Sequence, residues 1–420
     1  MTEHSVASVL DGIAAISRPS FPLTQPKAVL VTGGAGFIGS HVADMLLDRG
    51  DSVVIVDELN DYYDLRLKKA NLDYLQAKYG PRFVFYKADI CDKDFMTHIF
   101  TRESPTHVCH LAARAGVRAS ILDPYIYVHS NIEGTTRLLD LARQFGVANF
   151  VYASSSSVYG NSDKDLLTED DAVAKPVSPY AATKKACELL AYTYSHLYGI
   201  NTTGLRFFTV YGPRGRPDMA PFKFIERVFH NIPIQQYGDG STSRDYTYIS
   251  DIAEGVVAAI DTPLGYEVIN LGNGRPYKLK DFISLVETCV GKKAVIQVMP
   301  EQPGDVERTC ADISKARRLI GYSPRVTFEE GIRKTTEWFK TAAENGIFGE
   351  DAASDERKNS GVASPDTTTS ASRTPSSKAK EDEPRPLARN VSDLELSSFV
   401  EKAPLQLRDR KVRVFDAPAP

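Results

Sequence analysis

The sequence of 420 residues predicts an α/β fold, in which a doubly wound parallel sheet is joined to a smaller C-terminal lobe. Three observations predict it. Short apolar runs alternate with helical patterns, the first run ends in a glycine-rich turn, and the second run ends in an aspartate. Near-continuous apolar runs separated by helices indicate strands of a parallel sheet that is covered on both faces.

The expected strands follow one another through the first half of the chain. They are the segments KAVLVTGG from residue 27, SVVIVD from 52, FVFYKADI from 83, HVCHLAA from 107 and NFVYASS from 149. The helical segment SHVADMLLDRG separates the first two. Beyond about residue 210 the alternation weakens and glycine and proline become more frequent, which predicts a lobe that mixes helices and strands.

A glycine-rich turn lies between the first strand and the first helix. Gly33, Gly36 and Gly39 give the spacing GxxGxxG, and glycine lets backbone N–H groups approach a pyrophosphate at a helix N-terminus. Asp57 ends the next strand, where a carboxylate accepts hydrogen bonds from ribose hydroxyls and repels a 2′-phosphate. Together these features predict a Rossmann domain that binds NAD rather than NADP. Asp89, at the end of the third strand, is either a contact to the adenine edge or a helix cap.

A tyrosine and a lysine stand four residues apart in YAATK. On a helix, Tyr180 and Lys184 share one face, so the ammonium can stabilise a phenolate that removes a proton from a substrate hydroxyl. The serine run at residues 154–157 ends a predicted strand, and the carboxyl ends of strands line the ligand crevice in such sheets. We therefore expect a serine hydroxyl to share the proton with Tyr180.

Composition limits the other classes of function. The formal net charge of −4 gives no reason to expect a nucleic-acid or anionic-membrane partner, and no apolar run is long enough to span a bilayer. The five cysteines are scattered and form no CxxC pair, which favours a reducing, cytoplasmic location. With few histidines and no HxxxH arrangement, no metal is expected at the site.

The chain divides into segments of different composition. We expect a poorly ordered arm over residues 1–26, an NAD-binding Rossmann domain with the catalytic residues over 27–210, and mainly a substrate-binding lobe over 211–345. Residues 346–420 are rich in Ser, Thr, Lys, Asp, Glu and Pro, which predicts a disordered tail. Its last part contains the segments LELSSFV and VRVF, which are apolar enough to dock locally.

Several motifs resemble those of the extended short-chain dehydrogenase/reductases that act on nucleoside-diphosphate sugars. They are TGGAGFIGSH, HLAA, SSSSVYG, YAATKK, RFFTVYGP and RDYTYISDIA. Two more segments, VDELNDYYDLRLKKANL and VYGPRGRPDMAPFKF, resemble the UDP-glucuronate 4-epimerases. The resemblance covers about residues 27–341. It implies reversible 4-epimerization of UDP-glucuronate to UDP-galacturonate, through a 4-keto intermediate and transient NADH, in an enzyme that is usually a homodimer.

The resemblance also implies roles for individual residues. Ser155 corresponds to the catalytic hydroxyl, Tyr180 to the base, and Arg244 and Asp305 lie along the nucleotide sugar. The sugar carboxylate is implied to face Ser156, Ser157, Thr209 and Arg216. The residues implied to contact NAD are Gly33, Gly36, Phe37, Ile38, Gly39, Asp57, Asp89, Ile90, Leu111, Ala113, Tyr180 and Lys184.

Single positions favour epimerization over related reactions. Similar dehydratases carry Asp-Glu where this chain has Ser156 and Ser157, and similar UDP-glucuronate decarboxylases carry Glu at the position of Ser157. UDP-galactose epimerases usually carry Asn at the position of Thr209. A UDP-xylose-forming decarboxylase, a UDP-glucose/galactose 4-epimerase and a non-catalytic NAD-binding scaffold remain as alternatives.

Overall fold

A computed structural model describes residues 26–300, 306–348 and 414–416 of the chain. Residues 1–25 of the expected arm, and residues 349–413 and 417–420 of the expected tail, lie outside this description. No helix in the described ranges is long and apolar enough to cross a membrane.

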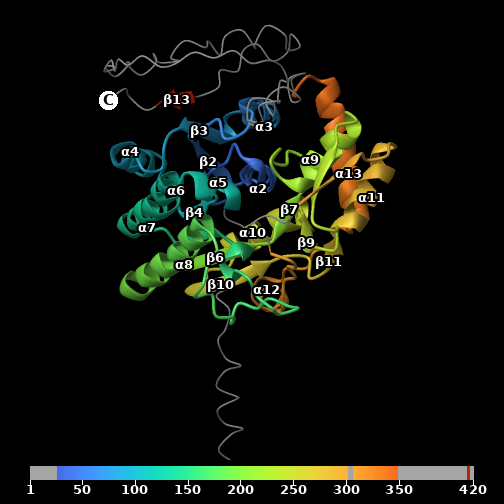
Figure 1. Cartoon of the computed structure of the whole chain (residues 1–420). Helices are drawn as coiled ribbons and strands as arrows, with labels where there is room; N and C mark the ends of the chain where they lie inside the picture. Colours follow the sequence, from blue (N-terminus) through green and yellow to red (C-terminus); the bar gives the residue numbers. More distant parts are fainter. Residues whose placement is uncertain (1–25, 301–305, 349–413, 417–420) are drawn as a thin grey trace, which may run out of the picture.

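A parallel sheet forms the centre of the molecule, with the strand order β10-β6-β5-β4-β1-β2-β3-β13 (Figure 1). The order reverses between β1 and β4, so the ligand crevice of a doubly wound sheet lies at their carboxyl ends. All the strands expected from the apolar runs are present, which confirms the predicted fold class. Their bounds are β1 (Ala28–Thr32), β2 (Ser52–Asp57), β3 (Phe83–Lys87), β4 (His107–His110), β5 (Asn149–Ser155), β6 (Thr202–Phe207), β10 (Tyr266–Leu271) and β13 (Val414–Asp416).

Helices cover both faces of this sheet because neighbouring strand residues point to opposite sides. Val29 and Val31 join an apolar cluster with α2 (Phe37–Asp48) and α10 (Ile249–Asp261), whereas Leu30 joins one with α4 (Lys93–Glu103), α7 (Gly134–Gln144) and α8 (Pro179–Tyr198). The other elements of this domain are α3 (Leu65–Tyr79), η1 (Gly80–Arg82), α5 (Val117–Leu122), α6 (Pro124–Tyr127), η2 (Val128–Glu133) and η3 (Ser156–Tyr159).

A second lobe contains two small sheets and lies beside the central sheet, on the right in Figure 1. One sheet has the order β11-β9-β7 and the other pairs β12 with β8. The elements are β7 (Thr209–Tyr211), α9 (Ala220–Phe229), β8 (Ile234–Tyr237), β9 (Ser243–Tyr248), β11 (Pro276–Lys278), α11 (Leu279–Val290), β12 (Ile296–Met299) and α13 (Phe328–Glu344). Helix α12 (Ser314–Ile320) packs instead against β10 and α10 of the first domain.

After residue 210, where the domain boundary was expected, the chain returns from the second lobe to the first domain. After the first part of the second lobe, α10 packs against α2 and β10 pairs with β6 in the central sheet. Residues 249–271 therefore complete the Rossmann domain, and the rest of the segment 211–345 forms most of the second lobe. The pattern in this region is a helix followed by a strand, which the more frequent glycines and prolines obscured.

One part of the expected tail has regular structure. β13 pairs in parallel with β3, so that Val414 lies opposite Phe85 and Asp416 opposite Lys87. Val414 and Phe415 belong to the segment VRVF, so this pairing agrees with its expected local docking. The segment LELSSFV lies outside the described residues, and the expected disorder of the rest of the tail stays a prediction. Hydrogen bonding to β3 explains the pairing, because an edge strand offers unpaired backbone groups.

Candidate functional site

Helix α8 presents the tyrosine and the lysine of the YAATK motif. The Ser178 hydroxyl caps its first turn by accepting a hydrogen bond from the Ala181 N–H at 3.1 Å, and Pro179 is its first residue. Tyr180 and Lys184 are therefore one turn apart on the same face. The Lys184 ammonium lies 6.0 Å from the centroid of the Tyr180 ring and donates a hydrogen bond to the Ala153 carbonyl at 2.8 Å.

The serine run begins where β5 ends. Ser155 is the last residue of the strand, and its Oγ donates to Ser157 Oγ at 3.1 Å while accepting from the Ser157 N–H at 3.2 Å. This local turn starts η3 and turns the run across the carboxyl edge of the sheet. Lys184 on α8 donates its hydrogen bond to Ala153 of β5, and this bond fixes the position of α8 relative to the serine run.

The glycine-rich turn is shaped for close approach of a ligand to backbone. Gly33 has φ +69°, and a Cβ atom at Gly39 would lie only 2.2 Å from the Gly33 carbonyl oxygen. Helix α2 begins at Phe37, so its free N–H groups face this turn. A dinucleotide pyrophosphate fits these features, because it needs exposed backbone donors and no intervening side chain.

Asp57 closes β2 beside this turn. Its two carboxylate oxygens accept from the Ala35 N–H at 3.2 Å and the Leu59 N–H at 2.9 Å. The ammonium of Lys68, from α3, lies 3.7 Å from the same carboxylate, and both side chains are nearly buried. The carboxylate is thus fixed at the strand end where a ribose would lie.

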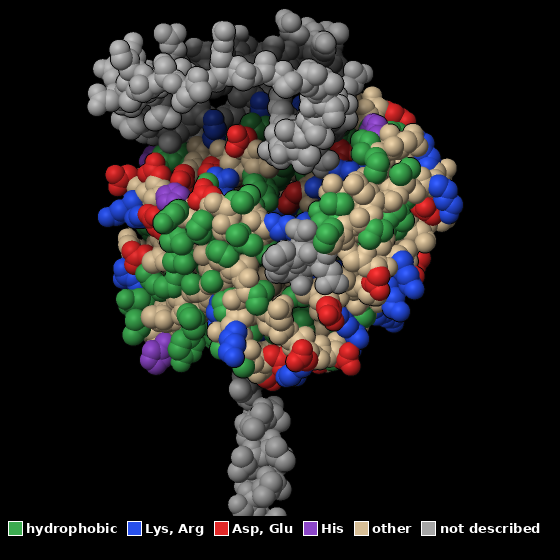
Figure 2. Space-filling view, in the orientation of Figure 1, with side chains coloured by type: hydrophobic (Ala, Val, Ile, Leu, Met, Phe, Trp, Pro, Cys, Tyr) green, Lys and Arg blue, Asp and Glu red, His purple; other side chains and the backbone are tan. Residues whose placement is uncertain are grey.

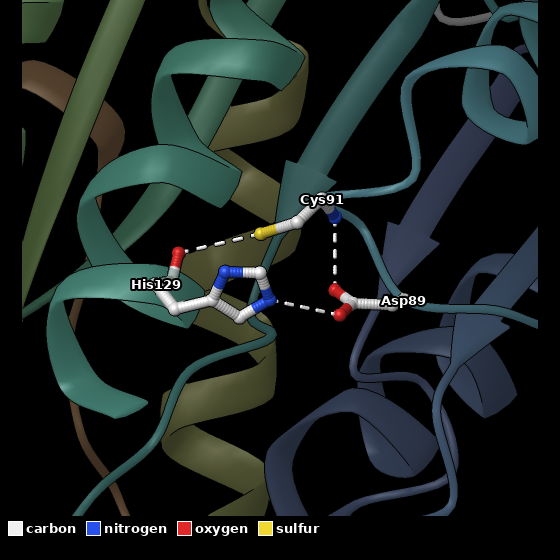
Figure 3. A group of neighbouring side chains, drawn as sticks. All are labelled: Asp89, Cys91 and His129. Atoms are coloured by element: carbon white, nitrogen blue, oxygen red, sulfur yellow. Dashed lines mark hydrogen bonds and ion pairs between the residues drawn. The ribbon is translucent and has the colours of Figure 1, made fainter. Parts of the chain in front are cut away.

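Asp89 lies two residues beyond the end of β3, in a cluster with Cys91 and His129 (Figure 3). Its Oδ2 lies 3.0 Å from His129 Nε2, and its Oδ1 accepts from the Cys91 N–H at 2.9 Å. The Cys91 thiol donates to the His129 carbonyl at 3.3 Å. These hydrogen bonds account for the convergence of the three side chains, and they orient Asp89 at the cofactor end of the site.

A cavity of about 380 Å³ brings most of the expected residues together. Arg244 is absent from its lining; the guanidinium donates to the carbonyls of Ser243 at 2.9 Å and Glu307 at 3.1 Å. Asp305 lies outside the described residues. The expected residues that line the cavity are Gly33, Gly36, Phe37, Ile38, Gly39, Asp57, Asp89, Ile90, Leu111, Ala113, Ser155, Ser156, Ser157, Tyr180, Lys184, Thr209 and Arg216.

Further residues in the lining were not predicted from the sequence. Several come from the loop after β2 and from the loop after β4, and others from the elements around the cavity. They include Glu58, Asn60, Tyr62, Tyr63, Lys68, Arg114 and Met219. The segment VDELNDYYDLRLKKANL was the available signal for Tyr62, Tyr63 and Lys68, since a motif rich in polar and aromatic residues directly after Asp57 must lie at the same sheet edge.

Arg216 is held by an acidic neighbour at the cavity. Its Nε and Nη2 donate to the two oxygens of Asp218 at 3.0 and 2.5 Å, and the Tyr62 hydroxyl donates to the same carboxylate at 3.3 Å. Burial opposes the charge of Arg216, but attraction to Asp218 and, more weakly, to Tyr62 and Tyr180 outweighs it and raises the Arg216 pKa.

Comparison with known families and proteins agrees with this site. Residues 30–335 match the family described as GDP-mannose 4,6 dehydratase. A UDP-glucuronate 4-epimerase of Thermodesulfobacterium geofontis is 49% identical over 312 residues, which are 74% of this chain and 95% of the relative. UDP-glucuronate 4-epimerase 4 of Arabidopsis thaliana is 43% identical, over 74% of this chain and 75% of the relative.

Solved structures give the same result. The UDP-glucuronic acid 4-epimerase of Bacillus cereus, solved with UDP-glucuronic acid and NAD, superposes with a TM-score of 0.71 at 38% identity, covering 75% of this chain and 99% of that one. A UDP-glucose 4-epimerase of Thermotoga maritima superposes with a TM-score of 0.69 at 33% identity, covering 75% and 99%. The resemblance inferred from the motifs is therefore confirmed.

Proposed function

Since this chain belongs to the UDP-glucuronate 4-epimerase family of NAD-dependent nucleotide-sugar enzymes, we propose that its cavity interconverts UDP-glucuronate and UDP-galacturonate. The observation that carries the proposal is the composition of one cavity, which unites a dinucleotide turn, the pair Tyr180 and Lys184, and an arginine among hydroxyls. The enzyme is an isomerase with NAD as its cofactor.

Tyr180 is the base for the C4 hydroxyl of the sugar. Lys184, fixed by its hydrogen bond to Ala153, favours the phenolate, and the Ser155 hydroxyl shares the proton. When bound, NAD accepts a hydride from C4 and returns it to the opposite face of the same carbon. The protein must therefore hold the sugar ring loosely enough for the ring to rotate between the first and the second hydride transfer.

The carboxylate on C5 needs its own anchors. Oxidation at C4 makes the sugar a β-keto acid, which loses CO₂ when the carboxylate bond aligns with the carbonyl π system. Ser156, Ser157, Thr209 and Arg216 line the cavity, and hydrogen bonds from them hold the carboxylate out of that alignment. None of the three hydroxyls is an acid or base at neutral pH, so elimination and decarboxylation lack their catalysts.

The nucleotide extends from this centre toward the second lobe. Arg244 lies on β9 of that lobe, and we assign it, with Asp305, to the nucleotide part of the UDP-sugar. The family resemblance supports this assignment.

The enzyme forms a homodimer through the face of α6 and α8. Hydrophobic side chains gather over these helices and the end of α5 (Figure 2). Leu122, the last residue of α5, and Tyr125, Leu189 and Leu197 are between 58% and 88% exposed. A contiguous apolar surface of this kind marks a protein interface. Sedimentation should give the mass of two chains, and the Leu189→Glu variant should sediment as one.

We assign the enzyme to the cytoplasm. Cys91, Cys109, Cys187, Cys289 and Cys310 are all free thiols, as expected in a reducing compartment. Fractionation of cells that produce the tagged enzyme tests this assignment.

Deuterium at C4 of UDP-glucuronate tests the mechanism. A hydride that leaves C4 and returns to it should remain in the UDP-galacturonate formed in ordinary water. Loss of the label to solvent would exclude this mechanism and indicate deprotonation at carbon instead.

A further inference from the structure

Every cation in the described lining of the cavity already has a partner inside the protein. Lys184 donates to the Ala153 carbonyl, and Lys68 lies between Asp57 and the Asn60 carbonyl. The remaining two cations pair with acids: Arg114 lies 3.0 Å from Glu58, and Arg216 forms two hydrogen bonds with Asp218. A substrate with an extra carboxylate therefore meets cations whose charge is already shared with an internal partner.

Arg216 is the cation in the best position for a carboxylate on C5. C5 is bonded to C4, the carbon on which Tyr180 acts, and the charge of Arg216 interacts with the Tyr180 side chain. Its guanidinium also lies over the Tyr62 ring, 5.6 Å from the centroid, which fixes its plane beside the cavity.

Asp218 occupies the donors that a substrate carboxylate would use. The Arg216 fork directs Nε and Nη2 to the two oxygens of Asp218, and this is the geometry in which a guanidinium binds any carboxylate. The Tyr62 hydroxyl holds Asp218 in that position from the other domain.

We propose that Asp218 competes with the substrate carboxylate for Arg216 and is thereby a specificity-determining residue that weakens binding of acidic sugars. The proposal rests on the assignment of Arg216 as carboxylate anchor. When a uronate binds, its carboxylate replaces that of Asp218 on the same guanidinium. The interaction with Arg216 therefore adds less binding free energy than it would if the arginine had no acidic partner. A neutral sugar leaves the internal pair intact.

The Asp218→Asn variant tests this competition. It keeps the size of the side chain and removes the charge, so the KM for UDP-glucuronate should fall by about threefold to tenfold. The inhibition constants of UDP-glucose and UDP should change less than about twofold. A KM that rises or stays the same, or an equal change for all three compounds, would overturn the proposal.

Asp64→Asn is a matched control. Asp64 and Arg66 have the same two-residue spacing as Arg216 and Asp218, and the Asp64 side chain is 35% exposed compared with 33% for Asp218. Asp64 does not line the cavity, and asparagine still caps α3. This variant should bind UDP-glucuronate like the wild type.

The Arg216→Met variant tests the role of Arg216 as carboxylate anchor separately from the competition by Asp218. If Arg216→Met weakens UDP-glucuronate but not UDP, and Asp218→Asn changes neither, only the competition is wrong. If Arg216→Met also leaves UDP-glucuronate unaffected, the carboxylate anchor itself is wrong. In the Arg216→Met background, Asp218→Asn should have no further effect on the KM.

Discussion

Glu188 and Arg206 form an ion pair that is closed off from solvent, one turn beyond Lys184 on α8. Arg206 Nε and Nη2 donate to the two carboxylate oxygens at 2.8 and 2.9 Å, and the side chains are 3% and 0% exposed. The Ser154 hydroxyl donates to the same carboxylate at 2.7 Å. Burial opposes the charge of Glu188, but these hydrogen bonds outweigh it and lower its pKa. The pair thus joins the catalytic helix to β5 and β6.

Removing one charge of this pair should destabilise the fold strongly. Glu188→Gln keeps the volume but leaves Arg206 buried without a counter-charge, so the free energy of unfolding should drop by about 3–5 kcal/mol. Urea denaturation measures it. Glu254→Gln, which breaks a solvent-exposed pair with Arg325, is the control and should lose much less. Equal losses would show that burial of the Glu188 pair has no special effect.

Tyr180→Phe should lower kcat at least about a hundredfold, because it deletes the hydroxyl that removes the C4 proton. NAD content and melting temperature should stay near wild type. Ser155→Ala removes only a partner in proton sharing and should cost less. Tyr79→Phe is the control, since the Tyr79 hydroxyl donates to the Asp44 carbonyl away from the cavity. Near-normal turnover by Tyr180→Phe would contradict the assignment of the base.

Asp57→Asn should reduce the preference for NAD over NADP, on the order of tenfold in the ratio of dissociation constants. The carboxylate that repels a 2′-phosphate is gone, and Lys68 loses its acidic partner next to it. Asp51→Asn, at the opposite end of β2, is the control. The role of Asp57 is wrong if the preference of the Asp57 variant is unchanged.

Acid should destabilise the protein well above the range in which carboxylates titrate. Burial, with a smaller contribution from neighbouring cations, lowers the pKa of His41 and His107 to about 4 and that of His110 to about 3. Below the ordinary value of 6.5 the unfolded chain binds protons that the native state does not, so the free energy of unfolding falls from about pH 6.5 toward pH 4.

Thermal unfolding at pH 7.5 and pH 5 measures this loss. His110→Gln should reduce the pH dependence, because His110 is held between Thr32 and Thr135 without a charge. The pKa of His129 is raised, mainly by the hydrogen bond with Asp89, so this one histidine stabilises the fold as the pH falls, against the three that destabilise it. An unfolding temperature that is the same at both pH values would contradict the account.

Local spacing explains which parts of the site could be predicted. The turn from Gly33 to Gly39 and the pair Tyr180 and Lys184 depend on contacts within a few residues, so their geometry follows from the sequence. The strand ends at Asp57 and Ser155 follow from apolar runs. In each case the backbone period alone decides where the side chains point.

Long-range contacts explain what could not be predicted. The pairing of β10 with β6, and of α10 with α2, joins residues that are separated by the first part of the second lobe. Likewise, Tyr62 meets Asp218 only because two loops from different domains face the same cavity. No periodicity in the sequence records such contacts, since they depend on how the two domains close on each other.

Product analysis from UDP-glucuronate tests the central claim most directly. The purified, NAD-loaded enzyme is incubated with UDP-glucuronate, and the nucleotide sugars are separated over time while absorbance at 340 nm follows NADH. We predict approach to a mixture of UDP-glucuronate and UDP-galacturonate, with little UDP-pentose and no net NADH. UDP-xylose as the main product, or epimerization of UDP-glucose while UDP-glucuronate remains unchanged, would contradict the proposed function.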